Sequence, residues 1–376
     1  MNFTDVSLSK ATIQTNKLLN NIQTFKSLLA KSTKFMAVIK ANAYSHGAIP
    51  LAREMEKAHA ADFFGVAQLS EALELRDAGI QTPILVFNSM RPNEIELAIK
   101  QNVALTVFSK EVAQEIVRMA ENLKHKARVH LKIDSGMARL GVTTFEEALD
   151  VYQSLNSEYV WIEGIYTHFA DAPDGQPGNF TQEQFARFKK ILDAFSDQQI
   201  SFDLRHCCNT AATLNFPEYQ LDMVRVGLGL YGLDPTLSAK GRDVLEPIET
   251  VQAIVTHVKD FPAGQSVGYD RTFFSKKPMR IATVAIGYAD GVAKSLSNVG
   301  WFTYKGHSLP IIGEICMDQL MLDCSEVEDL AIGNTVTYFG DPKDDHLLLT
   351  EVAKSANASQ YDLLCRIGNR VERVYQ

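Results

Sequence analysis

The sequence lacks the features that mark secreted and membrane-spanning proteins. No stretch reaches the ~18 uninterrupted apolar residues that a transmembrane helix needs. Residues 1–25 contain no basic segment followed by an apolar run, as a secretion signal would. We therefore expect a soluble, cytoplasmic protein with no membrane partner.

Cysteine is scarce as well, with 5 in 376 residues. An odd number of cysteines, without Cys-x-x-Cys or histidine-rich spacing, indicates neither a disulfide framework nor a zinc site. We expect no bound metal and reduced thiols at all five positions, which are Cys207, Cys208, Cys316, Cys324 and Cys365.

An excess of positive charge is also missing, because the formal net charge is -8. A nucleic-acid groove needs clustered lysine and arginine to neutralise phosphates. We therefore expect no nucleic-acid partner, although a small anion can still bind locally.

The sequence does contain a regular alternation of two patterns. Apolar, β-branched runs alternate with segments of helical period such as SEALELRDAGI (70–80), where Gly79 marks a helix stop. This alternation is typical of βα units around a parallel sheet and predicts an α/β fold, a (β/α)8 TIM-like barrel. The eight runs are residues 35–40, 63–68, 84–89, 105–109, 128–134, 161–169, 202–207 and 223–228.

Beyond residue 240 the pattern changes to short alternating strands separated by Gly, Pro and Asp turns. This indicates a mostly β C-terminal domain after the barrel, which agrees with the length and the 46% hydrophobic content. Pro235 and Pro247 bracket a polar linker at 233–247. We expect the barrel over 12–240 and the second domain over 1–11 and 241–376.

Lys40 is the first candidate for chemistry, because it closes the first run, FMAVIK. Active sites of such barrels lie at the carboxyl ends of the strands, and a lysine ending a buried strand is poorly explained as a solvated charge. Two alternatives stay open. The lysine could pair with a barrel carboxylate, or it could be the Schiff-base lysine of an aldolase that needs no cofactor.

A phosphate site is suggested after the seventh and eighth runs, where barrels often bind phosphate. Asn209 or Thr210 can cap a helix beginning at Ala211, which leaves backbone N–H groups for an anion. Gly227 permits close approach of a backbone amide. Each signal is weak alone, but together with Lys40 they fit a phosphorylated cofactor bound to lysine.

Arg225, in the eighth run, needs a partner if it is buried. That partner is either a barrel carboxylate or a cofactor nitrogen. His168 and His206 lie near the ends of the sixth and seventh runs, and a lone histidine there is more often a satisfied core residue than a catalyst.

Seven motifs, in order along both domains, resemble the alanine racemases. They are KANAYSHG from Lys40, GVAQLSEALELRDAGI (65–80), HLKIDSGMARLG (130–141), EGIYTHFA (163–170), RVGLGLYG (225–232), IGYADG (286–291) and EICMDQ (314–319). The resemblance implies that Lys40 carries pyridoxal 5'-phosphate as a Schiff base and is the base on one face of the substrate. Tyr269 would be the base on the opposite face, since racemisation removes a proton from one side and returns one to the other.

The resemblance also implies roles for residues around the cofactor. Arg225 would face the pyridine nitrogen and leave it unprotonated, because an arginine cannot give up its proton. The resulting electron sink would be weak and would favour reprotonation over transamination. His168 would neighbour Arg225. The implied phosphate-binding residues are Tyr44, Asn209, Thr210, Gly227 and Leu228.

For the substrate, the resemblance implies that Arg139 and the backbone of Met317 hold the carboxylate. Tyr288 and Cys316 would line the entrance and inner pocket, unless they only pack the β domain. Lys132 matches a lysine that several family members carbamylate. The sequence departs from the family at Ser45, where glycine is usual, at Asn369, where some members have a phosphate-contacting tyrosine, and after Tyr269, where DRTFFSKK replaces a glycine-containing turn.

The implied assembly is a homodimer with active sites at the interface, and the implied role is supply of D-alanine for peptidoglycan. Alternatives remain. A broad-specificity or serine racemase of the same fold is the nearest, followed by a fold-related decarboxylase of basic amino acids, for which the expected acidic and cysteine motifs are missing. A carrier that stores the cofactor without turnover is the third.

Overall fold

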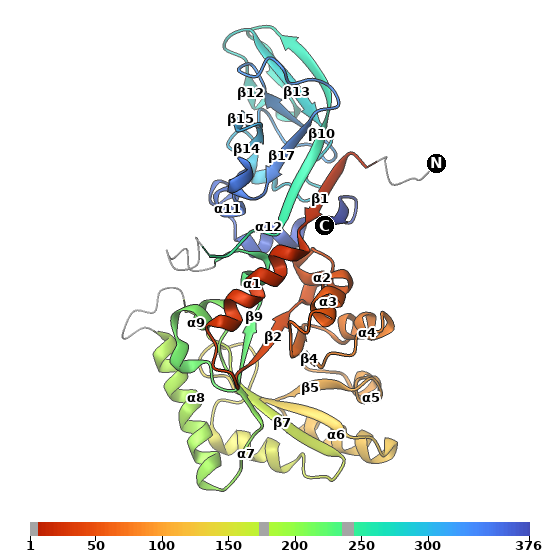
Figure 1. The fold of residues 1–376 in the computed structure, drawn as a ribbon, viewed down its shortest axis with the longest axis vertical. Coiled ribbons are helices and arrows are strands. Elements are labelled where there is room, and N and C mark those ends of the chain that lie inside the picture. Colours follow the sequence, from red (N-terminus) through yellow and green to blue (C-terminus); the bar gives the residue numbers. More distant parts are fainter. Residues whose placement is uncertain (1–6, 173–179, 235–243) are drawn as a thin grey trace. The chain divides into compact units, whose positions relative to one another are not determined.

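The computed structural model describes residues 7–172, 180–234 and 244–376 and divides into two compact units (Figure 1). The barrel unit comprises Leu19–Ala43 and Ala48–Leu245, and the β unit comprises the residues up to Leu18, Tyr44–Gly47 and Glu246–Gln376. Part of the predicted linker, including Pro235, lies outside the described residues, so the domain limits 12–240 and 241–376 stay a prediction.

The barrel unit is built on eight parallel strands, and each of the eight apolar runs contributes one. Neighbouring strands pair in the order β8-β7-β6-β5-β4-β3-β2-β9. The amide of Arg225 donates to Cys208 O at 3.0 Å and that of Asp222 to Arg205 O at 3.1 Å, which joins the two edges. The strands are β2 (Lys34–Val38), β3 (Phe63–Val66), β4 (Ile84–Val86), β5 (Val103–Val107), β6 (Ala127–Lys132), β7 (Val160–Tyr166), β8 (Leu204–His206) and β9 (Met223–Val226).

Helices connect the strands, and several begin at the caps that their sequences provide. Ser109 Oγ accepts from the amide of Val112, and Thr144 caps the amide of Glu147. The predicted helix at 70–80 ends before Gly79, whose φ is +87°. The helices are α1 (Thr15–Ser27), α3 (Ala48–Lys57), α4 (Leu69–Asp77), α5 (Pro92–Lys100), α6 (Lys110–Leu123), α7 (Phe145–Gln153), α8 (Phe180–Asp197) and α9 (Thr210–Asn215). Together with the strands they confirm the barrel class.

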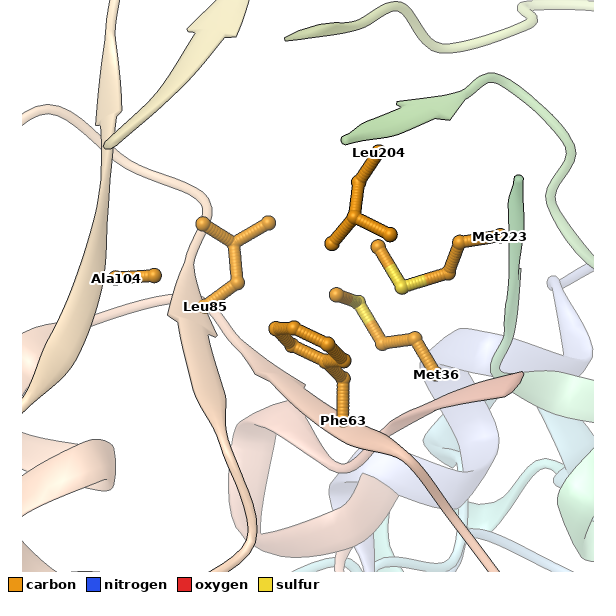
Figure 2. Packing of buried hydrophobic residues seen from close by; sticks show 6 residues of the cluster. All are labelled: Met36, Phe63, Leu85, Ala104, Leu204 and Met223. Carbon is orange, nitrogen blue, oxygen red and sulfur yellow. The ribbon is translucent and has the colours of Figure 1, made fainter. Parts of the chain in front are cut away.

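The barrel interior is filled by side chains, so the barrel is a packed core and not a pore. Figure 2 shows six buried side chains that converge from six strands. They are Met36, Phe63, Leu85, Ala104, Leu204 and Met223, and Phe87 packs against them. This layer is apolar, so the polar side chains of the barrel interior lie elsewhere.

The β unit is mostly strand, as predicted. β10 (Glu249–Phe261) pairs with β1 (Ser9–Ile13), β17 (Thr335–Phe339) and β13 (Met279–Val284). The other strands are β11 (Ser266–Val267), β12 (Phe273–Phe274), β14 (Trp301–Tyr304), β15 (His307–Pro310), β16 (Leu320–Asp323) and β18 (Glu372–Tyr375), with helices α11 (Leu349–Ala356) and α12 (Gln360–Arg366). A small apolar core of Val267, Met279, Ile281 and Ile312 supports the end that carries β11 and β12.

Among the helices of the described residues, none has the length and apolar character needed to cross a membrane. In the described part of the chain, which includes all five cysteines, no disulfide is formed.

Candidate active site

Lys40 lies two residues beyond the end of β2, on the side of the carboxyl ends of the barrel strands, and it is half-buried. It begins α2 (Lys40–Tyr44), whose backbone is left-handed: φ lies between 51° and 54° from Ala41 to Tyr44 and is 70° at Ser45. Left-handed backbone is unfavourable for residues other than glycine. Such strain persists only where the surrounding structure enforces it, and it often marks a functional segment.

Side chains hold this turn in place. Within the barrel unit, Glu71 accepts from the Ala41 amide at 2.5 Å, and Asn42 Oδ1 accepts from the Ala48 amide at 2.8 Å. Within the β unit, Ser45 Oγ donates to Leu364 O at 2.6 Å. Ser45, where glycine was expected, therefore occupies a left-handed position and gains a hydrogen bond that glycine cannot form.

Tyr44, within the turn, and His46, directly after it, are buried and belong to the β unit. The ring of Tyr44 lies 6.1 Å from that of Tyr361, and burial, followed by the nearby Tyr361, raises the pKa of the Tyr44 hydroxyl, which therefore stays protonated. His46 lies 3.4 Å from the buried carboxylate of Glu249, measured from Nε2 to Oε2. Asn369 lies in an exposed turn.

The predicted phosphate loops come together around Thr210. Asn209 caps α9 by accepting from the Ala212 amide at 3.0 Å, so the helix begins at Thr210, one residue earlier than predicted. Thr210 Oγ1 accepts from the amides of Gly227 and Gly229 at 3.0 and 3.4 Å. The first-turn amides of α9 have no acceptor within the helix, so donors for an anion remain at this position.

Glycine is required beside this loop. A Cβ on Gly229 would lie 2.4 Å from the ring of Phe25 and 2.8 Å from Thr210 Cγ2. In the described chain, the neighbouring Leu228 amide donates no hydrogen bond. The close packing and the remaining donor fit the backbone contacts that an anionic phosphate group needs.

Arg225 lies on β9 with its guanidinium buried. Its Nη2 donates to Thr167 O at 2.8 Å, to Cys207 O at 3.1 Å and to His168 Nδ1 at 3.1 Å, and its Nη1 donates to His206 Nδ1 at 2.9 Å. No ion pair of Arg225 with a carboxylate occurs among the residues that the structure describes. The sequence had left such an ion pair open, and neutral acceptors take its place.

A further set of polar residues in the barrel interior, on β6, β7 and β8, was not predicted from the sequence. His206 Nε2 lies 2.9 Å from His130 Nδ1, and His130 Nε2 lies 3.3 Å from Glu163 Oε2. Arg128 donates twice to Glu163, at 2.7 and 3.0 Å. His206, expected to be a satisfied core residue, is satisfied but also links Arg225 to this set.

A signal for these residues was present in the sequence. Arg128, His130 and Lys132 alternate along β6, and residues two apart on a strand share one face. Three polar side chains on one face of a buried strand indicate a polar barrel interior, which apolar-run analysis overlooks.

Lys132 is buried between cations. Burial, followed by the charges of Arg225 and Arg139, lowers the pKa of Lys132 well below its usual range, and Asp134 opposes this only partly. Its Nζ lies 4.1 Å from the centre of the Tyr166 ring. The charged form of Lys132 is therefore disfavoured at this position.

Arg139 is exposed on a loop that Asp134 organises. The Asp134 carboxylate accepts from the amides of Gly136, Met137, Ala138 and Arg139 at 2.8 to 3.1 Å. Burial opposes ionisation of Asp134, but these backbone hydrogen bonds prevail and lower its pKa. The loop therefore presents Arg139 from a fixed backbone.

The other predicted site residues lie in the β unit. Tyr269 is 70% exposed and lines, with Cys316, a hollow of about 450 Å³. The Tyr288 amide donates to Cys316 O at 3.1 Å, and the Ala289 amide donates to Met317 O at 3.0 Å. These contacts place Tyr288, Cys316 and Met317 together.

Glycine again permits the close approach. A Cβ on Gly287 would lie 2.3 Å from Met317 O and 2.4 Å from Cys316 O. In the loop after Tyr269, where the family has a glycine-containing turn, Asp270 and Arg271 adopt left-handed backbone with φ of 56° and 52°.

A parallel barrel with a lysine beyond a strand end, a buried arginine and amide donors beside Thr210 and Leu228 suits an enzyme that binds a small anionic molecule at its strand ends. Comparison with known proteins identifies which kind. Residues 13–235 match the family model of the alanine racemase N-terminal domain, and residues 248–375 match that of the C-terminal domain.

Relatives match over nearly the whole chain. Alanine racemase 1 of Oceanobacillus iheyensis is 41% identical over 96% of this chain and 96% of its own. The solved alanine racemase of Clostridium difficile 630 has a TM-score of 0.93 and 34% identity, covering 99% of this chain and 97% of that one. The Bartonella henselae alanine racemase, solved with covalently bound pyridoxal phosphate, has a TM-score of 0.88 and 27% identity, covering 98% and 100%.

The chain belongs to the alanine racemase family, as its motifs predicted, and is therefore an amino-acid racemase, an isomerase.

Proposed function

We propose that the protein interconverts L-alanine and D-alanine with pyridoxal phosphate bound at Lys40. The observation that carries this proposal is the match to alanine racemases over nearly the whole chain, with lysine at the end of the first barrel strand. The covalently bound cofactor of the Bartonella henselae structure supports the choice of cofactor.

The residues of the barrel unit fit this cofactor. The amides beside Thr210, Gly227 and Leu228 suit a phosphate, and Asn209 shapes that loop through its cap. Tyr44, kept protonated by burial, is proposed as a further donor to the phosphate. When bound, pyridoxal phosphate supplies an electron sink for the charge left on the α-carbon.

Arg225 and His168 are proposed beside the cofactor ring. A guanidinium only donates hydrogen bonds, so Arg225 would leave the ring nitrogen unprotonated and limit the strength of the sink. A weak sink favours immediate reprotonation of the α-carbon over transamination, and reprotonation on the opposite face gives racemisation.

Two bases are proposed to move the proton. The Lys40 amine acts on one face of the substrate and the Tyr269 hydroxyl on the other, because inversion requires removal and return on opposite faces. Tyr269 is mostly exposed in the β unit. We infer a homodimer in which Tyr269 of one chain meets Lys40 of the other.

The substrate carboxylate is proposed to bind Arg139 and the Met317 backbone, while Tyr288 and Cys316 line the entrance and the inner pocket. Lys132 is proposed to be carbamylated. A neutral amine reacts with carbon dioxide, loses a proton and becomes an anion, and this anion would be stabilised by the nearby Arg139 and Arg225, whose charges already act on Lys132.

The physiological role proposed is cytoplasmic supply of D-alanine for peptidoglycan, and the nearest alternative is a serine or broad-specificity racemase. The test is incubation of the purified protein with L-alanine in D2O. We expect D-alanine that carries deuterium at the α-carbon. Turnover of L-serine in place of L-alanine would select the alternative, and retained cofactor without any α-deuterium would select the carrier.

Matched variants test the two bases. Lys40→Ala is expected to lose both the visible absorbance of the lysine-bound cofactor and turnover. Tyr269→Phe is expected to keep the absorbance and lose racemisation. Full racemisation by Tyr269→Phe in both directions would refute the two-base assignment, and full activity of a monomer in sedimentation analysis would refute the shared site.

A further inference from the structure

A continuous chain of hydrogen bonds crosses the barrel interior from Arg225 to Glu163. Arg225 Nη1 lies 2.9 Å from His206 Nδ1, His206 Nε2 lies 2.9 Å from His130 Nδ1, and His130 Nε2 lies 3.3 Å from Glu163 Oε2. Arg128 closes the far end with two hydrogen bonds to Glu163. The side chains of these residues are buried or nearly so.

The chemistry of the two ends fixes the direction of every bond between them. A guanidinium only donates, so His206 Nδ1 accepts and its proton lies on Nε2. His206 Nε2–H then donates to His130 Nδ1, and His130 Nε2–H donates to Glu163, which as a carboxylate only accepts. Both imidazoles are thus held as neutral Nε2–H tautomers, with the donors aligned from Arg225 toward Glu163.

Burial and charge support the same assignment. Burial, then the charge of Arg225, lowers the pKa of His206 well below its usual range, and burial also lowers the pKa of His130. Burial opposes ionisation of Glu163, but its hydrogen bonds with His130 and Arg128 prevail and lower its pKa to about 2. These shifts favour the neutral rings and the ionised carboxyl that the hydrogen-bond directions require.

Packing fixes the two rings. The Tyr166 ring stacks on His206, with the centroids 4.7 Å apart and an interplanar angle of 2°. A Cβ on Gly164 would lie 2.5 Å from His130 Nδ1, so only glycine leaves room for that ring. These contacts hold the two imidazole rings in the orientations that the aligned hydrogen bonds need.

We propose that Glu163 is a positioning residue that acts on Arg225 through His130 and His206. These linked hydrogen bonds confine the enzyme to racemisation. The proposal rests on the proposed function, in which Arg225 faces the cofactor ring. Glu163 holds His206 as an acceptor, so Arg225 keeps its place, where its guanidinium offers only N–H groups to the site. Without that constraint, water can protonate the ring nitrogen. The stronger sink would then let the amino group pass to the cofactor, and alanine would leave as pyruvate.

Glu163→Gln is the sharpest perturbation. An amide keeps the size of the side chain but turns one acceptor into a donor. If the NH2 group faces His130, it drives the proton of that ring to Nδ1 and then the proton of His206 to Nδ1, where it opposes Arg225. If the NH2 group faces Arg128 instead, two donors meet there. In that case the amide oxygen still accepts from His130 and the alignment survives, so the histidine ring signals distinguish the two arrangements.

The matched control is Asp222→Asn. Asp222 also accepts two hydrogen bonds from one arginine, Arg205 Nε and Nη2 at 2.6 and 3.0 Å, on neighbouring parts of the barrel. It has no hydrogen bond to either histidine. Loss of a bidentate ion pair is therefore common to both variants, whereas loss of the aligned chain is specific to Glu163→Gln.

The first measurement uses the cofactor-bound protein labelled with ¹⁵N-histidine, because ring-nitrogen chemical shifts distinguish the two tautomers and the imidazolium. In the wild type we expect Nε2–H for both His130 and His206 throughout the neutral pH range. A proton on Nδ1 of His206, or a charged ring, would overturn the proposal without any variant. This measurement does not depend on racemisation. It therefore distinguishes an error in the proposed hydrogen-bond alignment from an error in the proposed function.

The second measurement is pyruvate released per racemisation event. We expect Glu163→Gln to shift the His206 and His130 signals and to raise this ratio about tenfold, which corresponds to about 1.4 kcal/mol of barrier. Asp222→Asn should change neither quantity. An unchanged ratio with shifted histidine signals, a raised ratio with unshifted signals, or an equal rise in Asp222→Asn would overturn the proposal.

Discussion

Glu249 provides a quantitative test of how burial controls stability in the β unit. Neither of its carboxylate oxygens accepts a hydrogen bond in the described part of the chain, and His46 Nε2 approaches to 3.4 Å without hydrogen-bond geometry. Burial raises the pKa of Glu249 from 4.5 to about 8, and the charge of Arg373 offsets this only in part. The folded protein therefore keeps a proton that the unfolded chain releases.

The sign of the pH dependence follows from this difference. The stabilising contribution is fully present below pH 4.5 and is lost as the pH rises toward about 8. The loss is about 1.4 kcal/mol per pH unit and reaches about 5 kcal/mol over the interval. Glu249→Gln removes the titration. A pH-independent penalty of about 1–3 kcal/mol for the buried amide can accompany the change.

The assay is urea unfolding of wild type and Glu249→Gln, at matched cofactor concentration, across this pH range. We expect the free energy of unfolding of the variant, relative to wild type, to rise by about 4 kcal/mol between about pH 5 and about pH 8. Glu328→Gln, an exposed glutamate of the same unit, should give a flat difference. A flat or falling difference for Glu249→Gln would refute the reasoning.

Three further predictions concern the site. With ¹³C-bicarbonate, the wild type should give a carbamate NMR signal that Lys132→Arg lacks. The variant should also have a KM for alanine raised about tenfold, as expected for loss of an interaction with a charged group. Identical spectra of wild type and variant would contradict carbamylation of Lys132. Gly287→Ala should displace the Met317 carbonyl and lower kcat/KM at least about tenfold, while the absorbance of the bound cofactor is kept. Unchanged kinetics would show that the close approach of Gly287 to Met317 does not matter for the site. Asp134→Ala should raise KM more than it lowers kcat, because four loop amides lose their acceptor; the reverse pattern would disprove a loop-positioning role for Asp134.

The barrel was readable from the sequence because buried parallel strands are continuous apolar runs. All eight runs coincide with strands, yet their ends were less exact. The first run was predicted to extend to Lys40, whereas β2 ends at Val38. The difference arises because a left-handed turn of residues other than glycine has no sequence signature.

The site was readable only in part. Polar residues at strand ends, such as Lys40, stand out against apolar runs. The pairing of Arg128 with Glu163 does not, because these residues are 35 apart in the sequence and meet only when β6 and β7 pair. Tyr269 lies exposed in a short turn, so no periodicity distinguishes it from any other surface tyrosine, and only the family resemblance singled it out.

The left-handed turn from Ala41 to Ser45 also determines when, during folding, the segment after Lys40 takes its final shape. Each such residue is unfavourable by about 1–2 kcal/mol, so the turn cannot form in an isolated segment and depends on partners such as Glu71 and Leu364, far away in the sequence. The backbone that follows Lys40 therefore takes this shape only once those distant segments have folded. A misfolded or nascent chain carries the same lysine without this turn, so the turn distinguishes the folded protein from its incompletely folded forms.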